Sequence, residues 1–158
     1  MAGTESLLTF EDLTPGRSFT FPPRALSRQE IVDFARQWDP QPFHLDEAAA
    51  RASHFGGLVA SGWQTGSLCM RMVADGLLNR STSMGSPGVE EMKWLKPVRP
   101  DDPLTLTLTV LEARPSRSKP DRGNVHLGYQ LVNREGETVM SLLCWVMFKR
   151  RAPGTVSG

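Results

Sequence analysis

The second half of the chain carries the clearest alternation of hydrophobic and polar residues. The segment 104–111, LTLTLTVL, has a period of two, which predicts a strand with one buried face. Apolar runs predict three further strands, at Val89–Leu95, Val125–Val132 and Thr138–Phe148. The segment 133–136, NREG, fits a hairpin turn between the last two strands. We therefore expect an antiparallel sheet in this half.

The first half has helical periodicity after a short strand predicted at Arg17–Phe21. Ser27 and Glu30 have the spacing of a capping box, which predicts that a helix begins there. That helix should end near residue 38, since Pro40 disfavours helical angles in the residue before it. Its buried face is expected to contain residues at i, i+3, i+4 and i+7, namely Ile31, Phe34, Ala35 and Trp38.

Two more helices are expected before the sheet. Asp46 is a suitable N-cap for a short helix over Glu47–Ala52. A longer central helix is predicted over Ser61–Leu78, and its only charged residues are Arg71 and Asp75. A helix with so few charges should be surrounded by other structure. We expect its large side chains to belong to the core, including those of Trp63, Met70 and Met72.

A helical first half followed by antiparallel strands indicates the α+β class. The chain of 158 residues fits one domain, which we place at residues 1–151, and we expect a disordered tail at 152–158. The hydrophobic fraction of 39% and the charged fraction of 22% are those of an ordinary globular protein. A net charge of +1 favours neither a nucleic-acid partner nor a membrane surface.

Cysteine usage and the N-terminal sequence bear on disulfides, metal binding and cellular location. Cys69 and Cys144 lie in apolar runs, as buried free thiols do, and their spacing fits neither a disulfide framework nor a metal site. The first residues, MAGTESLLTFEDL, lack the basic and apolar regions of a signal peptide. No apolar stretch approaches the length of a membrane span. We expect a cytoplasmic protein without a metal or cofactor.

Candidate chemistry lies between residues 39 and 63. Asp39 and His44 are separated by four residues, two of them prolines, and Ser61–Gly62 begins the predicted central helix. A carboxylate, an imidazole and a helix N-terminus are suited to acid–base chemistry on a carbonyl compound. The alternative is structural, because Asp39 could be a turn residue and His44 a hydrogen-bonded core histidine.

These residues resemble the MaoC-like dehydratases, which include the R-specific enoyl-CoA hydratases. The family pattern is Asp, any residue, Asn-Pro, any residue and His, followed later by a Gly that begins a helix after His or a small residue. The resemblance covers residues 10–150. The matching segments read DPQPFH (39–44), SGW (61–63), LKPVRPDDPL (95–104), SKPDRG (118–123) and NREGETVM (133–140).

The resemblance implies a hot-dog fold, in which a curved sheet surrounds a long helix. It implies Asp39, His44 and Gly62 as catalytic residues, with the Gly62 amide stabilising the enolate, and Gln41, Ser61 and Trp63 as substrate-binding residues. Two positions depart from the pattern: Gln41 replaces the usual Asn, and Ser61 stands where many hydratases have His. Ser61 also fits a helix N-cap.

The implied activity is syn addition of water to a trans-2-enoyl thioester of coenzyme A or a carrier protein, giving an R-3-hydroxyacyl thioester, in a homodimer. A hot-dog thioesterase is disfavoured because residues 63–70 contain no carboxylate. A non-catalytic binding subunit is disfavoured by the retained acid–base pair. We expect Asp46 to cap a helix rather than act in catalysis, His54 to be structural, and His126 to be a surface or interface residue. A solvated loop is expected to hold the basic residues Arg114, Arg117, Lys119 and Arg122, with contact to coenzyme A phosphates as the alternative.

Overall fold

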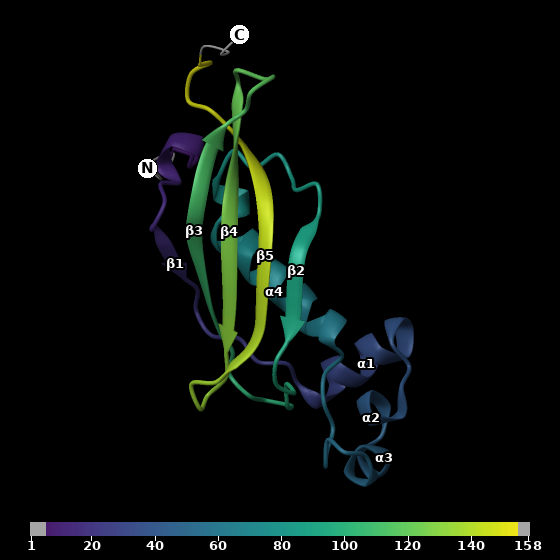
Figure 1. The fold of residues 1–158 in the computed structure, drawn as a ribbon. Helices are drawn as coiled ribbons and strands as arrows, with labels where there is room; N and C mark the ends of the chain where they lie inside the picture. Colours follow the sequence, from purple (N-terminus) through teal and green to yellow (C-terminus); the bar gives the residue numbers. More distant parts are fainter. Residues whose placement is uncertain (1–5, 155–158) are drawn as a thin grey trace, which may run out of the picture.

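The computed structural model describes residues 6–154 and contains one five-stranded antiparallel sheet (Figure 1). The strand order across the sheet is β1-β3-β4-β5-β2, so β1 and β2 form its two edges. The strands are β1 (Ser18–Thr20), β2 (Val89–Trp94), β3 (Thr105–Pro115), β4 (Arg122–Val132) and β5 (Thr138–Lys149). Every neighbouring pair is antiparallel, and β4 and β5 form a long hairpin.

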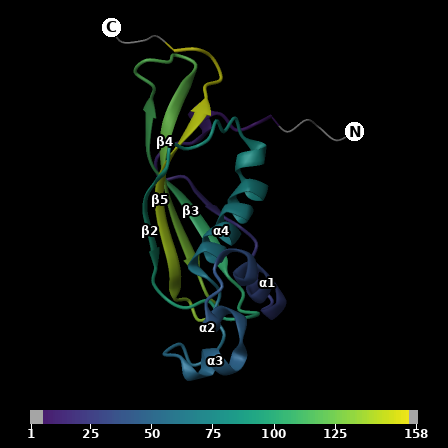
Figure 2. The ribbon, with the colours of Figure 1, turned by 90° about the vertical axis from the view of Figure 1, so that its right-hand side faces the viewer.

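The longest helix, α4, runs along one face of the curved sheet, and three shorter helices gather at one end of the molecule (Figure 2). Their bounds are α1 (Arg28–Trp38), α2 (Pro42–Leu45), α3 (Glu47–Ala52) and α4 (Gly62–Gly76). Two 3-10 helices are also present, η1 (Phe10–Asp12) and η2 (Leu78–Arg80). A curved antiparallel sheet around a central helix confirms both the predicted α+β class and the hot-dog fold.

The core lies between α4 and the inward face of the sheet. Alternate residues of the three long strands are buried, as a period of two requires when one face is covered. From α4, the side chains of Leu68, Cys69, Met72 and Val73 pack into the same cluster. Both cysteines are buried and free, as predicted. The sheet and helix are thereby fixed against each other, and the first turn of α4 holds a defined position.

Most predicted elements are confirmed to within a few residues. The Ser27 side chain accepts from the Glu30 amide while Glu30 accepts from the Ser27 amide, so the capping box begins α1 as expected. Helix α3 has the predicted bounds and is capped by Asp46. The turn at residues 133–136 closes with Gly136 at φ 81°, a left-handed angle that glycine tolerates readily.

Three predictions of burial are wrong. Trp38, Trp63 and Met70 are 67%, 62% and 53% exposed, whereas Met72 is in the core as expected. Trp38 is the last residue of α1, and no described segment covers it. Trp63 and Met70 lie at the margin of the contact between α4 and the sheet, beside the edge strand β2: Trp63 meets Trp94 edge-on, and Met70 lines a cavity with Val89. Helical spacing indicates which residues share a face, but it does not reveal whether another segment covers that face.

The ends of the chain are described only in part. Residues 152–154 of the expected tail are described, and the Gly154 amide donates to the Pro120 carbonyl at 2.8 Å. Residues 155–158 lie outside the described range, as do residues 1–5. Within residues 6–154, no helix has the length and hydropathy needed to cross a membrane.

Candidate active site

His44 is held by a short helix that sequence reasoning missed. Residues 42–45 form α2, a single turn with Pro42 at its first position, where a missing amide hydrogen costs nothing. The His44 ring is buried, and its Nδ1 lies 2.6 Å from the Val59 carbonyl oxygen. A carbonyl oxygen only accepts hydrogen bonds, so Nδ1 must be the protonated donor. The other ring nitrogen, Nε2, is then the atom that can gain or lose a proton.

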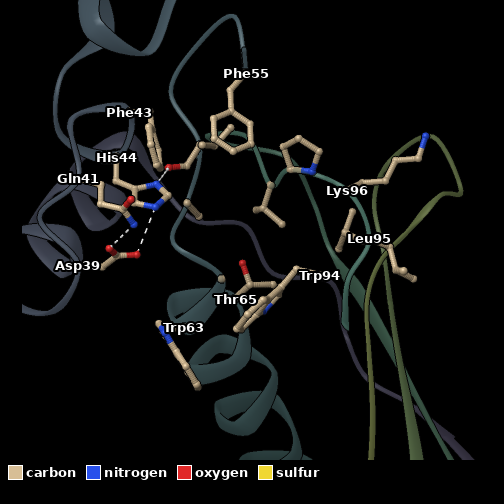
Figure 3. Close-up of a pocket in the computed structure, with 16 residues that line it drawn as sticks. Asp39, Gln41, Phe43, His44, Phe55, Trp63, Thr65, Trp94, Leu95 and Lys96 are labelled. Carbon is tan, nitrogen blue, oxygen red and sulfur yellow. Dashed lines mark hydrogen bonds and ion pairs between the residues drawn. The ribbon is translucent and has the colours of Figure 1, made fainter. Parts of the chain in front are cut away.

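Asp39 ends α1 and receives hydrogen bonds at both carboxylate oxygens. Its Oδ2 lies 3.3 Å from His44 Nε2 and accepts from the Ser61 hydroxyl at 2.7 Å. Its Oδ1 accepts from the Gln41 side-chain amide at 2.7 Å. Three side chains thus hold one carboxylate: His44 of α2, Gln41 at the N-cap of α2 and Ser61 at the N-cap of α4. Figure 3 shows the first two of these contacts.

The hydrogen bonds around Asp39 determine its charge. Burial alone raises the pKa of this carboxyl, but the hydrogen bonds from Ser61 and Gln41 and the nearby His44 ring together outweigh burial, and the pKa lies below its ordinary value. Asp39 is therefore a stable carboxylate at neutral pH.

The N-terminus of α4 lies beside this pair. Ser61 is fully buried, and its hydroxyl accepts from the Trp63 amide at 3.3 Å while it donates to Asp39. Gly62 is the first helical residue, so its amide has no acceptor within the helix. Its Cα is in close contact with Trp94: a Cβ added at Gly62 would lie 2.6 Å from the indole. Only glycine fits at this position without displacing that ring.

A pocket of about 470 Å³ connects these groups. Figure 3 shows Asp39 and His44 on one side, Trp94, Leu95 and Lys96 on the other, and the first turn of α4 below. Phe43 and Phe55 line the upper wall with ring centroids 5.1 Å apart. The pocket thus combines a proton-exchanging pair, a free helix amide and apolar walls. That combination suits an uncharged chain attached to a polarised carbonyl group.

Comparison with known proteins gives the family of this chain. The family model described as "MaoC like domain" matches residues 10–131, which is most of the chain. The chain belongs to the MaoC-like family. The MaoC-like dehydratase of Rhodospirillum rubrum has a similar structure, with 41% identity and a TM-score of 0.85 over 92% of this chain and 99% of that chain.

Two further proteins are similar to this chain in sequence or in structure. The uncharacterized protein YdeM of Bacillus subtilis (strain 168) is 31% identical over 71% of this chain and 79% of its own length. The R-hydratase PhaJ1 of Pseudomonas aeruginosa has a TM-score of 0.73 at 22% identity, covering 96% of this chain and 97% of that chain. The second comparison is evidence of the shared fold alone.

The residues singled out in the MaoC-like sequence mostly meet at this pocket. Asp39, Gln41, His44, Gly62 and Trp63 all line it. Ser61 does not line the pocket: it lies beneath Asp39 and both orients that carboxylate and caps α4. Sequence reasoning did not single out two of the lining groups, Trp94 and the Phe43–Phe55 pair. These come from segments far apart in the chain, and nothing in their spacing indicates that they meet.

The other polar candidates lie elsewhere. Asp46 accepts from the Ala49 amide as a cap, and His54 is exposed beside Phe55. His126 is on the outer face of the sheet, where it pairs with Glu90 at 2.7 Å. Figure 1 shows the β3–β4 hairpin, which carries the basic residues 114–122, at the end of the sheet away from α1–α3. Among residues 6–154, no group of three or more His, Cys, Asp or Glu could hold a metal ion.

Proposed function

We propose that this MaoC-like protein adds water reversibly to the double bond of a trans-2-enoyl thioester and forms an R-3-hydroxyacyl thioester. The observation that carries the proposal is the Asp39–His44 pair, with Nε2 as its proton-exchanging atom, facing a pocket whose floor is a free helix N-terminus. The thioester is carried by coenzyme A or by a carrier protein. The reaction itself needs no other cofactor.

His44 is the proton carrier in this proposal. Its Nε2 accepts a proton from a water molecule as the water oxygen bonds to the β-carbon of the enoyl group. The resulting imidazolium is stabilised by the Asp39 carboxylate at 3.3 Å and by the Val59 carbonyl at Nδ1. The same Nε2–H then protonates the α-carbon. General acid–base groups of this kind contribute about 10²–10⁴-fold to a rate.

Gly62 stabilises the negative charge that develops on the thioester oxygen. As water adds to the β-carbon, the electron pair of the double bond moves toward the thioester oxygen and leaves an enolate. The Gly62 amide, aided by the positive end of α4, donates to that oxygen. The electron pair returns to form the bond between the α-carbon and hydrogen. Water is consumed, and no proton is gained or lost by the protein over the cycle.

The stereochemistry follows from having one proton carrier. Because the hydroxyl and the hydrogen both come from the side of the pocket that holds Asp39 and His44, they add to the same face of the double bond. The reverse reaction uses the same groups and is a dehydration. Thioester hydrolysis is less well supported, since Asp39 is the only carboxylate among the lining residues and hydrogen bonds already occupy both of its oxygens.

The test is an assay of the purified protein with crotonyl-CoA and longer or branched trans-2-enoyl-CoA substrates. Loss of enoyl absorbance measures hydration, chiral analysis of the product identifies the R or S alcohol, and a thiol reagent detects free coenzyme A. The proposal predicts an R-3-hydroxyacyl product without thiol release. Thiol release at the rate of substrate loss would identify a thioesterase instead, and no turnover of any enoyl thioester would contradict the proposal.

A further inference from the structure

A second cavity, of about 220 Å³, lies beside the catalytic pocket between α4, β2 and β5. Gly62 and Thr65 of α4 line the catalytic pocket, and Gly66, Cys69 and Met70 on the next turn line the second cavity. The two spaces therefore follow one another along the same helix.

The walls of the second cavity are almost entirely apolar. They include Leu78, Val89, Leu142 and Val146. The two thiols are neutral, because burial, with a small contribution from Cys144, raises the pKa of Cys69 to about 12, and burial likewise raises the pKa of Cys144. A hydrocarbon chain is the kind of ligand that such walls accept.

Two side chains of β2, Trp94 and Met92, lie against the turns of α4 that line the two spaces. Trp94 lies against Gly62, where an added Cβ would be 2.6 Å away, and makes an edge-on contact with Trp63 at 5.3 Å between ring centroids. Met92 reaches the next turn, where an added Cβ at Gly66 would lie 3.5 Å from its Cε atom.

The register of β2 explains why both side chains point toward α4. Trp94 is paired with Met140 and Met92 with Leu142, and these two β5 residues face the core. A register shift between Val89 and Glu91 brings Val89 opposite Cys144, on the same inward side. Along β2, the inward residues are therefore Val89 at the second cavity, Trp94 at the catalytic pocket and Met92 between them.

We propose that Trp94 and Met92 form a partition that closes the catalytic pocket toward the second cavity and so restricts the protein to short-chain enoyl thioesters. This inference rests on the proposed function. An acyl chain that extends from the thioester at Gly62 along α4 meets the indole of Trp94 before it reaches the apolar cavity. Longer chains bind only when the partition is removed.

The experiment measures kcat/KM for hydration of trans-2-enoyl-CoA substrates with four and eight carbons. The wild-type protein is expected to prefer the four-carbon substrate. Trp94→Ala and Met92→Ala are expected to raise the eight-to-four ratio, because each newly buried methylene contributes about 0.8 kcal/mol, or roughly fourfold. If two methylenes of the eight-carbon chain become buried in a variant, the eight-to-four ratio of kcat/KM should rise roughly 15-fold.

Two controls separate the partition from general effects on the edge strand. Trp94→Phe keeps a ring at the partition and should retain the short-chain preference. Lys93→Ala shortens the residue between the two, whose side chain pairs with Glu91 and is more than half exposed, and should leave the ratio unchanged. Met92→Ala still tests the partition if Trp94→Ala does not fold. A wild-type preference for the eight-carbon substrate, or unchanged ratios in the folded Ala variants, would overturn the partition.

A binding measurement keeps this inference separate from the proposed function. Calorimetry with butyryl-CoA and octanoyl-CoA needs no turnover. If the wild type hydrates no enoyl thioester, the proposed function fails, and the partition is then tested by affinity alone. A gain of roughly 15-fold in octanoyl-CoA affinity relative to butyryl-CoA affinity in the Ala variants supports it. Equal changes for both ligands, or no change, contradict it.

Discussion

At the scale of single residues, Ser61 connects the start of the central helix to the acid. Its hydroxyl donates to Asp39 and accepts from the Trp63 amide, so one buried side chain both caps α4 and stabilises the carboxylate. A small hydroxyl residue at the position where many hydratases have His therefore has a physical role here. It is a positioning residue, since it does not line the pocket.

This arrangement makes a prediction about pH. Ser61→Ala removes a donor from Asp39, so the pKa of that carboxyl should rise toward its ordinary value. If activity requires the Asp39 carboxylate, the acid-side loss of kcat/KM should begin at a higher pH in this variant than in the wild type. Ser61→Thr keeps the hydroxyl and should restore the wild-type profile. A lower rate with an unmoved profile would indicate that Ser61 acts only as a helix cap.

Gly62 provides a second test at this scale. Gly62→Ala and Gly62→Pro both add a Cβ that displaces Trp94, but only proline removes the amide hydrogen, and proline is well accepted at the first helical position. Loss of one oxyanion donor costs about 10²–10³ in rate, so Gly62→Pro should be slower than Gly62→Ala by about that factor. Comparable turnover numbers in the two variants would exclude the Gly62 amide as the donor.

At the scale of elements, the periodic segments were predictable and the contacts between them were not. Strand β3 follows from alternation and β4 from an apolar run, and α1 and α3 follow from their caps and spacing. Helix α2 is too short to show a period, although it orients His44. The contact of Trp94 with Gly62 joins an edge strand to a helix N-terminus, and neither segment alone encodes it.

The candidate site, too, was predictable from the sequence only in part. Asp39 and His44 could be found because two ionisable residues flank a proline-rich segment before a small-residue helix. The hydrogen-bond network around the two side chains could not be predicted. It depends on the Val59 carbonyl and the Ser61 hydroxyl, which come from beyond α3. A hydrogen bond to a backbone group cannot be predicted from the type of residue that donates it.

A prediction at the scale of elements tests whether Asp46 caps a helix or acts as a catalytic carboxylate. Asp46 accepts from the Ala49 amide at the start of α3. Asp46→Ala should lower the free energy of unfolding by about 0.5–2 kcal/mol, and Asp46→Asn should change it little, because Asn caps helices as well as Asp does. Denaturant unfolding measures both variants. Hydration by folded Asp46→Asn should match the wild type, and a large loss of rate there would mean that the Asp46 charge takes part in the reaction.

At the scale of the whole molecule, one side of the protein is unusually apolar. Trp63 and Met70 of α4 are exposed close to β2, which is an edge strand and carries exposed Val89 and Trp94. Exposed apolar groups beside an unpaired strand edge are typical of a surface that a partner covers. We propose that a second copy of the chain covers this side, which also borders the catalytic pocket.

The homodimer can be tested by light scattering at micromolar concentration. The wild type is expected to have twice the mass of one chain. Met70→Glu places a charge on the apolar side and should shift the protein toward monomers, whereas Arg117→Glu, in the β3–β4 hairpin, changes charge far from it and should not. A wild-type monomer with full activity would show that the exposed side has another partner or none.

The most direct test of the whole account is the hydration rate of folded His44→Ala relative to the wild type, on the best enoyl-CoA substrate. If Nε2 carries the proton from water to the α-carbon, this variant should lose about 10²–10⁴-fold in kcat, with Asp39→Asn strongly impaired as well. Circular dichroism and unfolding establish that the fold is kept. A folded His44→Ala protein with near-wild-type turnover would contradict the account, because the proton would then be carried by another group.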